Sequence, residues 1–245
     1  DPKPVAGPQP PPVPGVHNSR WVQSPGAAIL GDPKRHAELK PYVDAVLRRY
    51  RQDGRIDGWD LFNEPDNPNT ESYGATELPD KVAKAQLLVE TTFAWARAVD
   101  PSQPLTAGPW RGEFWHPEKV SPLDAFMLEN SDVISFHAYV KPEPMRRRLE
   151  ALARFGRPML CTELIARGEG CTFAPTFADL RDKGVGAYAW GLVAGKTQTI
   201  YPWGTWKTAA KDEPAVWHHD ILRPDGTPFD PAEVAYIRRV TGGRG

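Results

Sequence analysis

The chain has 245 residues, of which 40% are apolar and 25% are charged, proportions typical of a globular protein with one substantial core. Its net charge of −1 argues against nucleic acid as the main partner, because binding to phosphates requires a basic surplus. No run approaches the roughly 18 apolar residues of a membrane span, and Asp1–Pro4 lacks the apolar core of a signal peptide. We therefore expect no nucleic-acid or membrane partner, and the compartment, secreted or cytoplasmic, stays open.

Residues 1–35 are predicted to form a proline-rich arm or surface loop. Proline fixes φ and lacks a backbone N–H, so such a run favours extended polyproline geometry over helix or central strand. The segment closes on His17, Asn18 and Trp21, which are unusual residues for a passive tether. A linker and a loop packed near a functional site are both compatible with this pattern, and the residue types favour the second.

Helical and strand patterns alternate over residues 36–245. Apolar residues spaced as on one helical face predict helices within 37–50, 82–96, 116–130, 145–152, 174–183 and 234–240. Short apolar runs between them predict strands at 56–64, 104–110, 132–139, 157–166 and 185–193. This alternation is typical of an α/β fold with parallel strands and crossover helices.

Polar or aromatic side chains stand at the end of every predicted strand. They are Glu64, Trp110, His137 with Tyr139, Glu163, and Trp190. In parallel α/β folds, functional sites are built at the C-terminal edge of the strands. We therefore expect these side chains to line one edge of the sheet.

Glu64 and Glu163 are the candidate catalytic residues. A buried carboxyl group is costly unless it is used or paired, and Glu64 taken alone is equally well explained as a cap for the following loop. A second glutamate in the same setting favours a catalytic pair, because retaining glycoside hydrolysis needs one carboxyl as proton donor and another as nucleophile, roughly 5 Å apart. The nine tryptophans and seven tyrosines fit a sugar ligand, since sugar rings stack on flat aromatic faces, although most aromatic residues fill cores.

Four features stand out together: the strand ending Trp59–Pro65, the later Ser135–Tyr139, the pair Thr162–Glu163, and Trp190. In combination they resemble clan A glycoside hydrolases, the retaining (β/α)8-barrel group that includes family 5 cellulases and mannanases. The resemblance implies a partial TIM barrel of five parallel strands, equivalent to barrel strands four to eight, with flanking helices. It also implies hydrolysis of β-linked glycosidic bonds in plant polysaccharides or oligosaccharides.

The resemblance assigns roles to individual residues. Glu64 is implied to be the general acid/base and Glu163 the nucleophile, while Asn63 would hydrogen-bond the sugar 2-hydroxyl. Tyr139 resembles the clan's tyrosine that binds the nucleophile, and His137 its neighbour near the acid/base.

Three tryptophans complete the candidate substrate-binding residues. Trp190 would lie under the sugar at the cleaved position, and Trp110 and Trp203 are further candidates. Core packing is the alternative for His137, Tyr139 and Trp190. The loop 195–206, which carries Trp203 and Trp206, is either a substrate subsite or a packed lid.

The sequence departs from the family pattern at its start. Equivalents of the first three barrel strands, and of the arginine that many members supply from strand two, are absent. Five strands would leave two bare sheet edges, which recruit pairing partners, so we expect a homo-oligomer that covers them. The alternative function is an inactive or weakly active barrel fragment that binds carbohydrate or serves as an assembly module.

The remaining polar clusters predict no further chemistry. His116 and His218–Asp220 lack the spacing of a known zinc motif and are expected in loops, so we expect no metal and no cofactor. Cys161 is predicted to be a small buried residue, and a disulfide with Cys171 is left open. Lys141 with Arg146–Arg148 is expected to form a solvated helix face.

Overall fold

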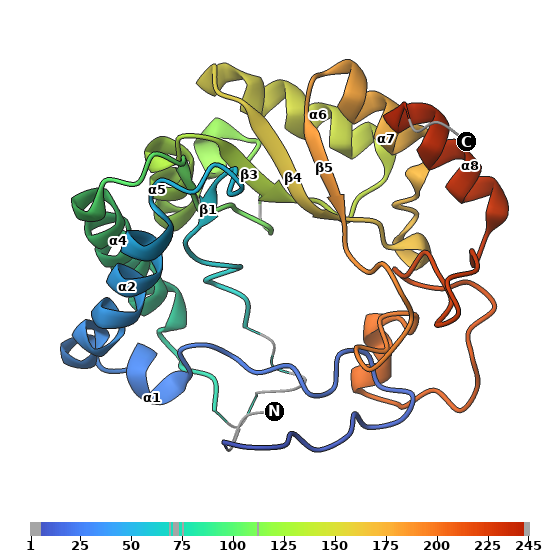
Figure 1. Cartoon of the computed structure of the whole chain (residues 1–245), viewed down its shortest axis with the longest axis horizontal. Coiled ribbons are helices and arrows are strands. Elements are labelled where there is room, and N and C mark those ends of the chain that lie inside the picture. Colours follow the sequence, from blue (N-terminus) through green and yellow to red (C-terminus); the bar gives the residue numbers. More distant parts are fainter. Residues whose placement is uncertain (1–5, 69, 71–73, 75, 112, 243–245) are drawn as a thin grey trace. The chain divides into compact units, whose positions relative to one another are not determined.

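The computed structural model describes residues 6–68, 70, 74, 76–111 and 113–242 (Figure 1). In this part of the chain helices alternate with short strands, which confirms the predicted α/β class. The chain divides into two compact units, and the boundary runs through the strands β3 (Ile134–His137) and β4 (Met159–Leu164). The predicted division into an arm, 1–35, and a catalytic domain, 36–245, stays a prediction.

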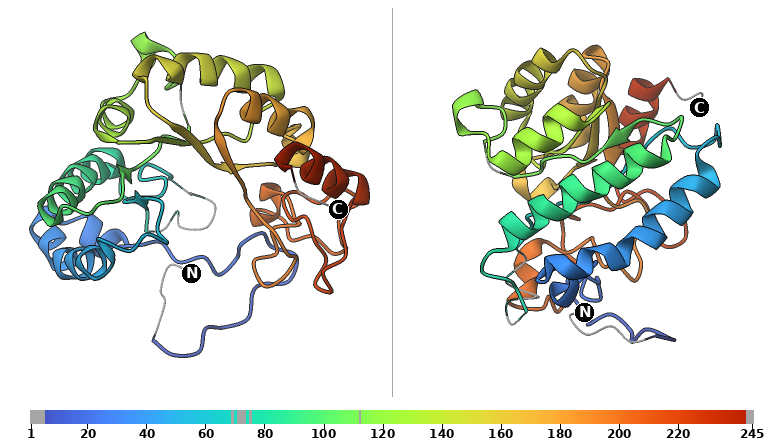
Figure 2. Two further views of the ribbon diagram at one scale, coloured as in Figure 1. Left: turned by 45° about the horizontal axis from the view of Figure 1, so that its top comes forward. Right: turned by 90° about the vertical axis from the view of Figure 1, so that its left-hand side faces the viewer.

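Unit 2 comprises residues 24–136 and 151–159. Its helices are α1 (Ala27–Leu30), α2 (Lys40–Tyr50), α4 (Lys81–Val99) and α5 (Pro122–Asn130), with the 3-10 turns η1 (Pro33–Leu39), η2 (Pro117–Lys119) and η3 (Ala153–Phe155). The strands β1 (Trp59–Asp60) and β2 (Leu105–Thr106) pair in parallel, with Trp59 opposite Leu105. The helices α2 and α4 lie side by side, as both views of Figure 2 show.

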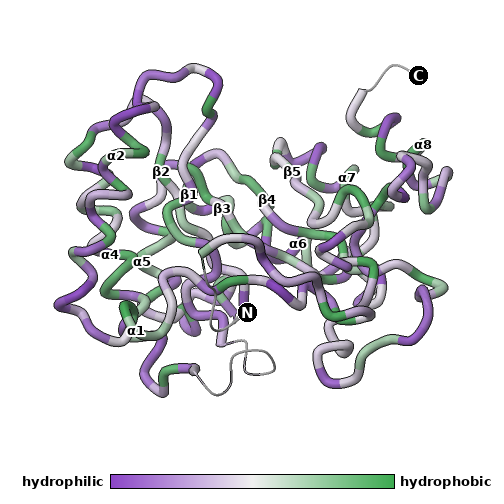
Figure 3. The backbone as a smooth tube through the Cα atoms, turned by 60° about the horizontal axis from the view of Figure 1, so that its bottom comes forward, coloured by the Kyte–Doolittle hydropathy of each residue, from purple (hydrophilic) through white to green (hydrophobic). Residues whose placement is uncertain are grey.

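The core of unit 2 lies between α2, α4, α5 and the β1–β2 pair. Leu47, Val89, Phe93, Leu105 and Met127 belong to one buried apolar cluster drawn from these elements. Val89, Phe93 and Ala96 follow the spacing of one helical face, so α4 buries that face. Figure 3 shows the corresponding alternation of polar and apolar residues along α2 and α4. The helices predicted at 37–50 and 82–96 are thereby confirmed.

The strands predicted at 56–64 and 104–110 were too long, because each contains only two residues in strand pairing. Proline lacks the N–H that a ladder needs, and Pro104 and Pro109 bound β2 on either side. Beyond β2, a Cβ atom at Gly108 would lie 2.4 Å from the Ser135 carbonyl oxygen, so only glycine permits this approach. Thr106 joins the segment before β3 through its hydroxyl, which donates to the Val133 carbonyl at 2.8 Å.

Unit 1 comprises residues 1–23, 137–150 and 160–245. Its elements are most of α6 (Pro142–Leu152), α7 (Phe173–Asp182), α8 (Pro231–Thr241), η4 (Arg167–Glu169), η5 (Trp203–Trp206) and the strand β5 (Gly186–Ala189). Strand order in the sheet is β3-β4-β5, and β4 and β5 are parallel. The helix α7 packs on both β5 and α8. The strands predicted at 132–139, 157–166 and 185–193 are confirmed in shortened form.

The basic cluster of α6 was predicted to be fully solvated, and this is wrong for one of its arginines. Arg146 and Arg147 pair with Asp179 and Glu143 at the surface, as predicted for a solvated face. Arg148 is instead buried, because it shares the i, i+3, i+4 face of Met145 and Leu149, and burial lowers its pKa to about 10.

The two cysteines lie in the same interior and are free thiols. Cys161 contacts the Glu163 carbonyl and Cys171 the Ala138 carbonyl through their sulfur atoms. Burial raises the pKa of both thiols, so they behave as small apolar residues. No helix in the described ranges is long and apolar enough to cross a bilayer.

Candidate active site

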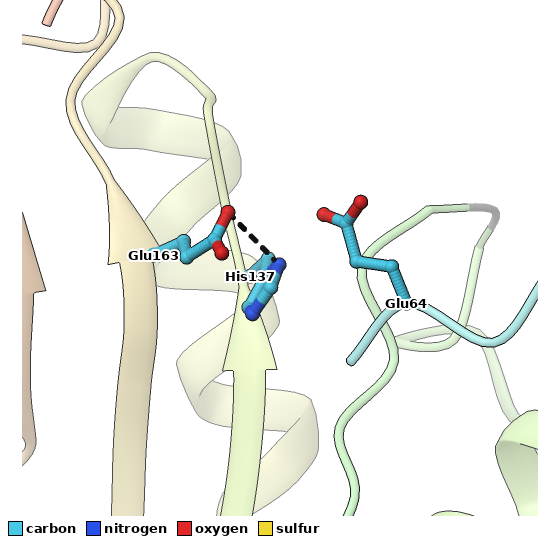
Figure 4. A group of neighbouring side chains, drawn as sticks. All are labelled: Glu64, His137 and Glu163. Carbon is cyan, nitrogen blue, oxygen red and sulfur yellow. Dashed lines mark ion pairs between the residues drawn. The ribbon is translucent and has the colours of Figure 1, made fainter. Parts of the chain in front are cut away.

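Glu163 lies near the end of β4, and its carboxylate is bound from the neighbouring strand. The Tyr139 hydroxyl donates to Glu163 Oε2 at 2.8 Å, and His137 Nδ1 lies 3.3 Å from the same oxygen (Figure 4). His137 ends β3 and Tyr139 follows it by two residues, so both side chains emerge at the end of the sheet where Glu163 lies. The backbone fixes this register, since the Ala138 N–H donates to the Glu163 carbonyl at 2.9 Å.

The chemistry of this arrangement suits an ionised carboxylate. Hydrogen-bond donors aimed at a carboxylate oxygen favour its charged form, which is the form that attacks as a nucleophile. From the sequence, only the family resemblance implied a contact between Tyr139 and Glu163. In the structure the Tyr139 hydroxyl is hydrogen-bonded to Glu163 Oε2. The catalytic role of Glu163 stays a prediction.

The backbone immediately after Glu163 is in an unusual conformation. Ile165 has φ of 77°, a left-handed value that is rare for a β-branched residue. Its carbonyl accepts a hydrogen bond from the His219 ring, and the preceding Leu164 carbonyl accepts the Trp190 N–H at 3.0 Å. Backbone strain of this kind persists where surrounding contacts impose it, and it clusters at functional sites.

Aromatic rings pack around Tyr139. The Trp203 ring meets Tyr139 edge-to-face with centroids 5.2 Å apart, and the His219 ring lies 5.4 Å from Tyr139. Trp203 also packs against His218 at 4.6 Å. The half-buried Trp203 therefore contacts the residue that binds Glu163, and either interpretation of its loop, subsite or lid, is compatible with that position.

The proline-rich start of the chain packs onto the same cluster. The Trp206 Nε1–H donates to the His17 carbonyl at 2.6 Å, and the His17 N–H donates to Thr205 Oγ1 at 3.0 Å. The His17 ring is buried and lies 5.3 Å from the ring of His219. These contacts confirm that the end of this segment is packed rather than a passive tether.

His218 and His219 lie in an irregular segment, as predicted, and both are buried, which the sequence did not indicate. Burial lowers the pKa of His218 to about 4 and that of His219 to about 2, and it also lowers the pKa of His17. All three imidazoles are neutral near pH 7 as a result. Arg167 fixes the backbone of this segment by donating to the carbonyls of Trp217, His219 and Asp220.

Glu64 lies in unit 2, after β1. It is the first residue of a turn. It has φ of 43°, and the Asn67 N–H donates to the Glu64 carbonyl at 3.0 Å. Pro65 occupies the second position of this turn, where its fixed φ is favourable. The Asn67 side-chain amide donates to Glu64 Oε2 at 2.6 Å. The neighbouring Asn63 is exposed.

Trp110 follows β2 and is bound to the segment after Glu64. Its indole Nε1–H donates to Asp66 Oδ1 at 2.6 Å, and Arg111 Nε donates to the other oxygen at 3.0 Å. Burial raises the pKa of the nearby Asp124 to about 6, and the negative charge of Asp66 acts in the same direction. Trp110 is therefore anchored to the Glu64 segment by a charge-assisted hydrogen bond.

Sequence reasoning missed three residues that contact the candidate catalytic pair or its partners: His219, Asn67 and Lys81. Asn67 had a recognisable signal, because Glu64-Pro65-Asp66-Asn67 has the composition of a tight turn that returns its fourth residue to its first. His219 and Lys81 had none, because their positions depend on contacts with segments distant in sequence.

No family model matches the sequence. No curated protein matches it either. The comparison with solved structures does find similar folds. An endo-β-1,4-xylanase of glycoside hydrolase family 10 from Gloeophyllum trabeum aligns with a TM-score of 0.56 at 18% identity, over 91% of this chain and 74% of that one.

Two further structures extend the comparison to other glycoside hydrolases. A β-D-glucuronidase from Dictyoglomus thermophilum aligns with a TM-score of 0.57 at 12% identity, over 91% of this chain and 39% of that one. An endo-β-1,4-mannanase from Thermotoga petrophila aligns with a TM-score of 0.53 at 18% identity, over 88% of this chain and 51% of that one. At such identities the comparisons show similarity of fold alone, to TIM-barrel glycoside hydrolases.

Proposed function

We propose that the chain is a retaining glycoside hydrolase that cleaves β-linked glycosidic bonds of plant polysaccharides or oligosaccharides. The observation that carries the proposal is the pair of groups at Glu163 Oε2, the Tyr139 hydroxyl at 2.8 Å and His137 Nδ1 at 3.3 Å. The shared fold with xylanases and a mannanase supports the same reaction class. A partial barrel equivalent to strands four to eight, with a family 5-like site, is part of this proposal.

In the proposed first step, a carboxylate oxygen of Glu163 attacks the anomeric carbon while Glu64 donates its proton to the departing glycosidic oxygen. The bond between that oxygen and the anomeric carbon breaks, and a covalent glycosyl–Glu163 ester forms. In the second step Glu64 accepts a proton from water, whose oxygen displaces Glu163 at the same carbon. Two inversions give net retention, and the mechanism requires the carboxyl groups to be roughly 5 Å apart.

The other candidate residues receive supporting roles. Tyr139 would orient Glu163 and favour its ionised form, while Asn63 would bind the sugar 2-hydroxyl. Trp110, Trp190 and Trp203 would offer flat faces to sugar rings.

A second function is favoured by one observation. In the described part of the chain the strands form two small sheets, β1-β2 and β3-β4-β5, instead of one continuous ladder. A weakly active or inactive fragment that binds carbohydrate, or serves as an assembly module, fits such short strands. Carbohydrate binding without turnover would identify this alternative.

The test is hydrolysis of a panel of aryl β-glycosides and β-linked polysaccharides by the wild type and three variants. We expect Glu163→Ala to lower kcat by at least about 10³-fold, because the nucleophile is lost. Glu64→Ala is expected to act most strongly on substrates with poor leaving groups, which need a proton donor. Glu143→Ala removes an exposed glutamate of α6 and serves as the matched control.

Equal activity in Glu163→Ala and the control would contradict the proposed nucleophile. A folded wild type without activity on any substrate would contradict the proposed hydrolase and favour the binding function.

A further inference from the structure

The turn that carries Glu64 is fixed from the first residue of α4. Lys81 Nζ donates to the backbone carbonyl of Asn67, the residue whose amide binds Glu64 Oε2. Lys81 also forms an ion pair with Glu77 at 3.0 Å. A continuous series of polar contacts therefore links α4 to the Glu64 carboxyl group.

The ion pair in this series is unusually well shielded from solvent. The side chains of Lys81 and Glu77 are only 10% and 11% exposed. A buried ammonium group is costly unless it is paired and hydrogen-bonded, and here Glu77 supplies the charge while Asn67 supplies an acceptor. Such an arrangement fixes geometry, because moving Asn67 would leave a buried cation short of an acceptor.

The start of the same helix has a second lysine–carboxylate ion pair, which contacts a different segment. Lys84 pairs with Asp80 at 3.2 Å, also four residues apart, and its Nζ donates to the Gly31 carbonyl at 2.7 Å. This pair is more exposed and fixes α1 instead of the Glu64 turn. It provides a matched control for substitutions in the first pair.

We propose that Asn67, fixed by the Lys81–Glu77 ion pair, is a positioning residue that sets the orientation of the Glu64 carboxyl group and the ease with which it gives up its proton. The proposal rests on the proposed function, in which Glu64 is the proton donor. The Asn67 amide donates to Glu64 Oε2, and the charge of Glu77 compensates that of Lys81, which holds the Asn67 carbonyl.

The first experiment is a ¹³C NMR titration of the Glu64 carboxyl group, assigned by comparison with Glu64→Gln. It needs no enzymatic activity. In Asn67→Ala the titration midpoint is expected to rise by about half a pH unit or more, because a donor to the ionised form is lost. In Glu77→Gln it is expected to fall, because the Lys81 charge is left uncompensated, while Asp80→Asn leaves it unchanged.

Asn67→Asp keeps the shape of the side chain. It tests the same contact if Asn67→Ala does not fold. It replaces the donor with an anion, so the midpoint is expected to rise further than in Asn67→Ala. Midpoints that stay within about 0.2 units in the folded Asn67 variants, or that move in the same direction in Glu77→Gln, would overturn the proposal.

The second experiment measures kcat/KM on aryl β-glycosides with a poor and a good leaving group. Asn67→Ala is expected to lower kcat/KM about tenfold or more for the poor leaving group and less than about twofold for the good one, since only the former needs a proton. In Asn67→Ala, the fall of kcat/KM on the alkaline side of the pH profile is expected to occur at higher pH than in the wild type. Equal losses on both substrates would indicate a merely structural residue and overturn the inference.

The two experiments separate this inference from the proposed function. A wild type that hydrolyses neither glycoside contradicts the function, while the titration still decides whether Asn67 and Glu77 act on Glu64.

Discussion

The two candidate catalytic glutamates are bound in different ways. Glu163 receives a hydroxyl and an imidazole from the end of a neighbouring strand, whereas Glu64 is bound by Asn67 within a turn that Glu64 itself begins. A nucleophile must stay ionised, and a general acid must hold its proton until the leaving group needs it. The partners of Glu163 fit the first requirement, because hydrogen-bond donors favour an ionised carboxylate.

Removal of the Tyr139 hydroxyl tests the first of these arrangements. Tyr139→Phe is expected to lower kcat about 10- to 100-fold with a small change in KM, because a hydrogen bond to a charged group contributes about 1.5–3 kcal/mol. Tyr188→Phe removes the hydroxyl of an exposed tyrosine on β5 and is the control. A kcat for Tyr139→Phe within about twofold of the wild type would contradict the role of this contact.

The contact between Tyr139 and Glu163 could be predicted from sequence, whereas the contact between Asn67 and Glu64 was not. Tyr139 lies two residues beyond the end of β3, and only the resemblance to clan A glycoside hydrolases implied its contact with Glu163. Asn67 lies in a polar segment, 66–80, without periodicity. The turn composition of residues 64–67 places Asn67 near Glu64, but the hydrogen bond from Lys81 to the Asn67 carbonyl has no signal in the local sequence.

Among the elements, helices were predicted well because their apolar faces repeat over many residues. The strands β1 and β2 were predicted too long. Pro104 and Pro109 limit the pairing of β2, whereas nothing in the run 56–64 indicates that β1 ends at Asp60. The burial of segment 217–220 was not predicted. This segment has no regular structure of its own, and its burial depends on Arg167, which donates to three of its carbonyls and pairs with Glu233.

Three of the buried histidines of unit 1, namely His17, His218 and His219, predict a loss of stability in acid. Their pKa values are lowered on folding, so the unfolded chain binds more protons below pH 6.5 and the stabilisation present at pH 7 is lost as the pH falls. Between pH 7 and pH 4.5 we expect His218 and His219 each to remove on the order of 2 kcal/mol from the free energy of unfolding. Urea unfolding across this range measures the slope.

His218→Phe isolates one contribution. It removes an imidazole whose two ring nitrogens have no hydrogen-bond partner among the described residues, so the slope with pH is expected to decrease whatever the absolute stability. His116→Phe, at an exposed histidine, is the control. Identical slopes in all three proteins would show that His218 is not neutral in the folded state.

For the whole molecule, the class of fold followed from the alternation of helical and strand patterns, and the structural comparisons agree with it. The extent of the sheet did not follow, because pairing joins segments that are distant in sequence, and the strands form two sheets, β1-β2 and β3-β4-β5. Within the described residues, β1 pairs only with β2, and β5 lies at the end of the order β3-β4-β5.

These strand edges lead us to propose a homo-oligomer that covers them. Exposed edges recruit further strands, and Tyr188 of β5 and the following Leu192 are large exposed side chains. Sedimentation equilibrium is expected to show a mass at least twice the 27.2 kDa of one chain. A single species with the mass of one chain over a wide concentration range would contradict this proposal.

The most direct test of the two-glutamate mechanism is the configuration of the product formed in the presence of azide. With an activated aryl β-glycoside, Glu163→Ala is expected to yield the α-glycosyl azide, because azide replaces the nucleophile in a single inverting step. Glu64→Ala is expected to yield the β-glycosyl azide, because azide attacks the glycosyl–Glu163 ester. Proton NMR distinguishes the two anomers. The same anomer from both variants, or no azide product from either while the wild type hydrolyses the substrate, would contradict the assignment of Glu163 as nucleophile and Glu64 as acid/base.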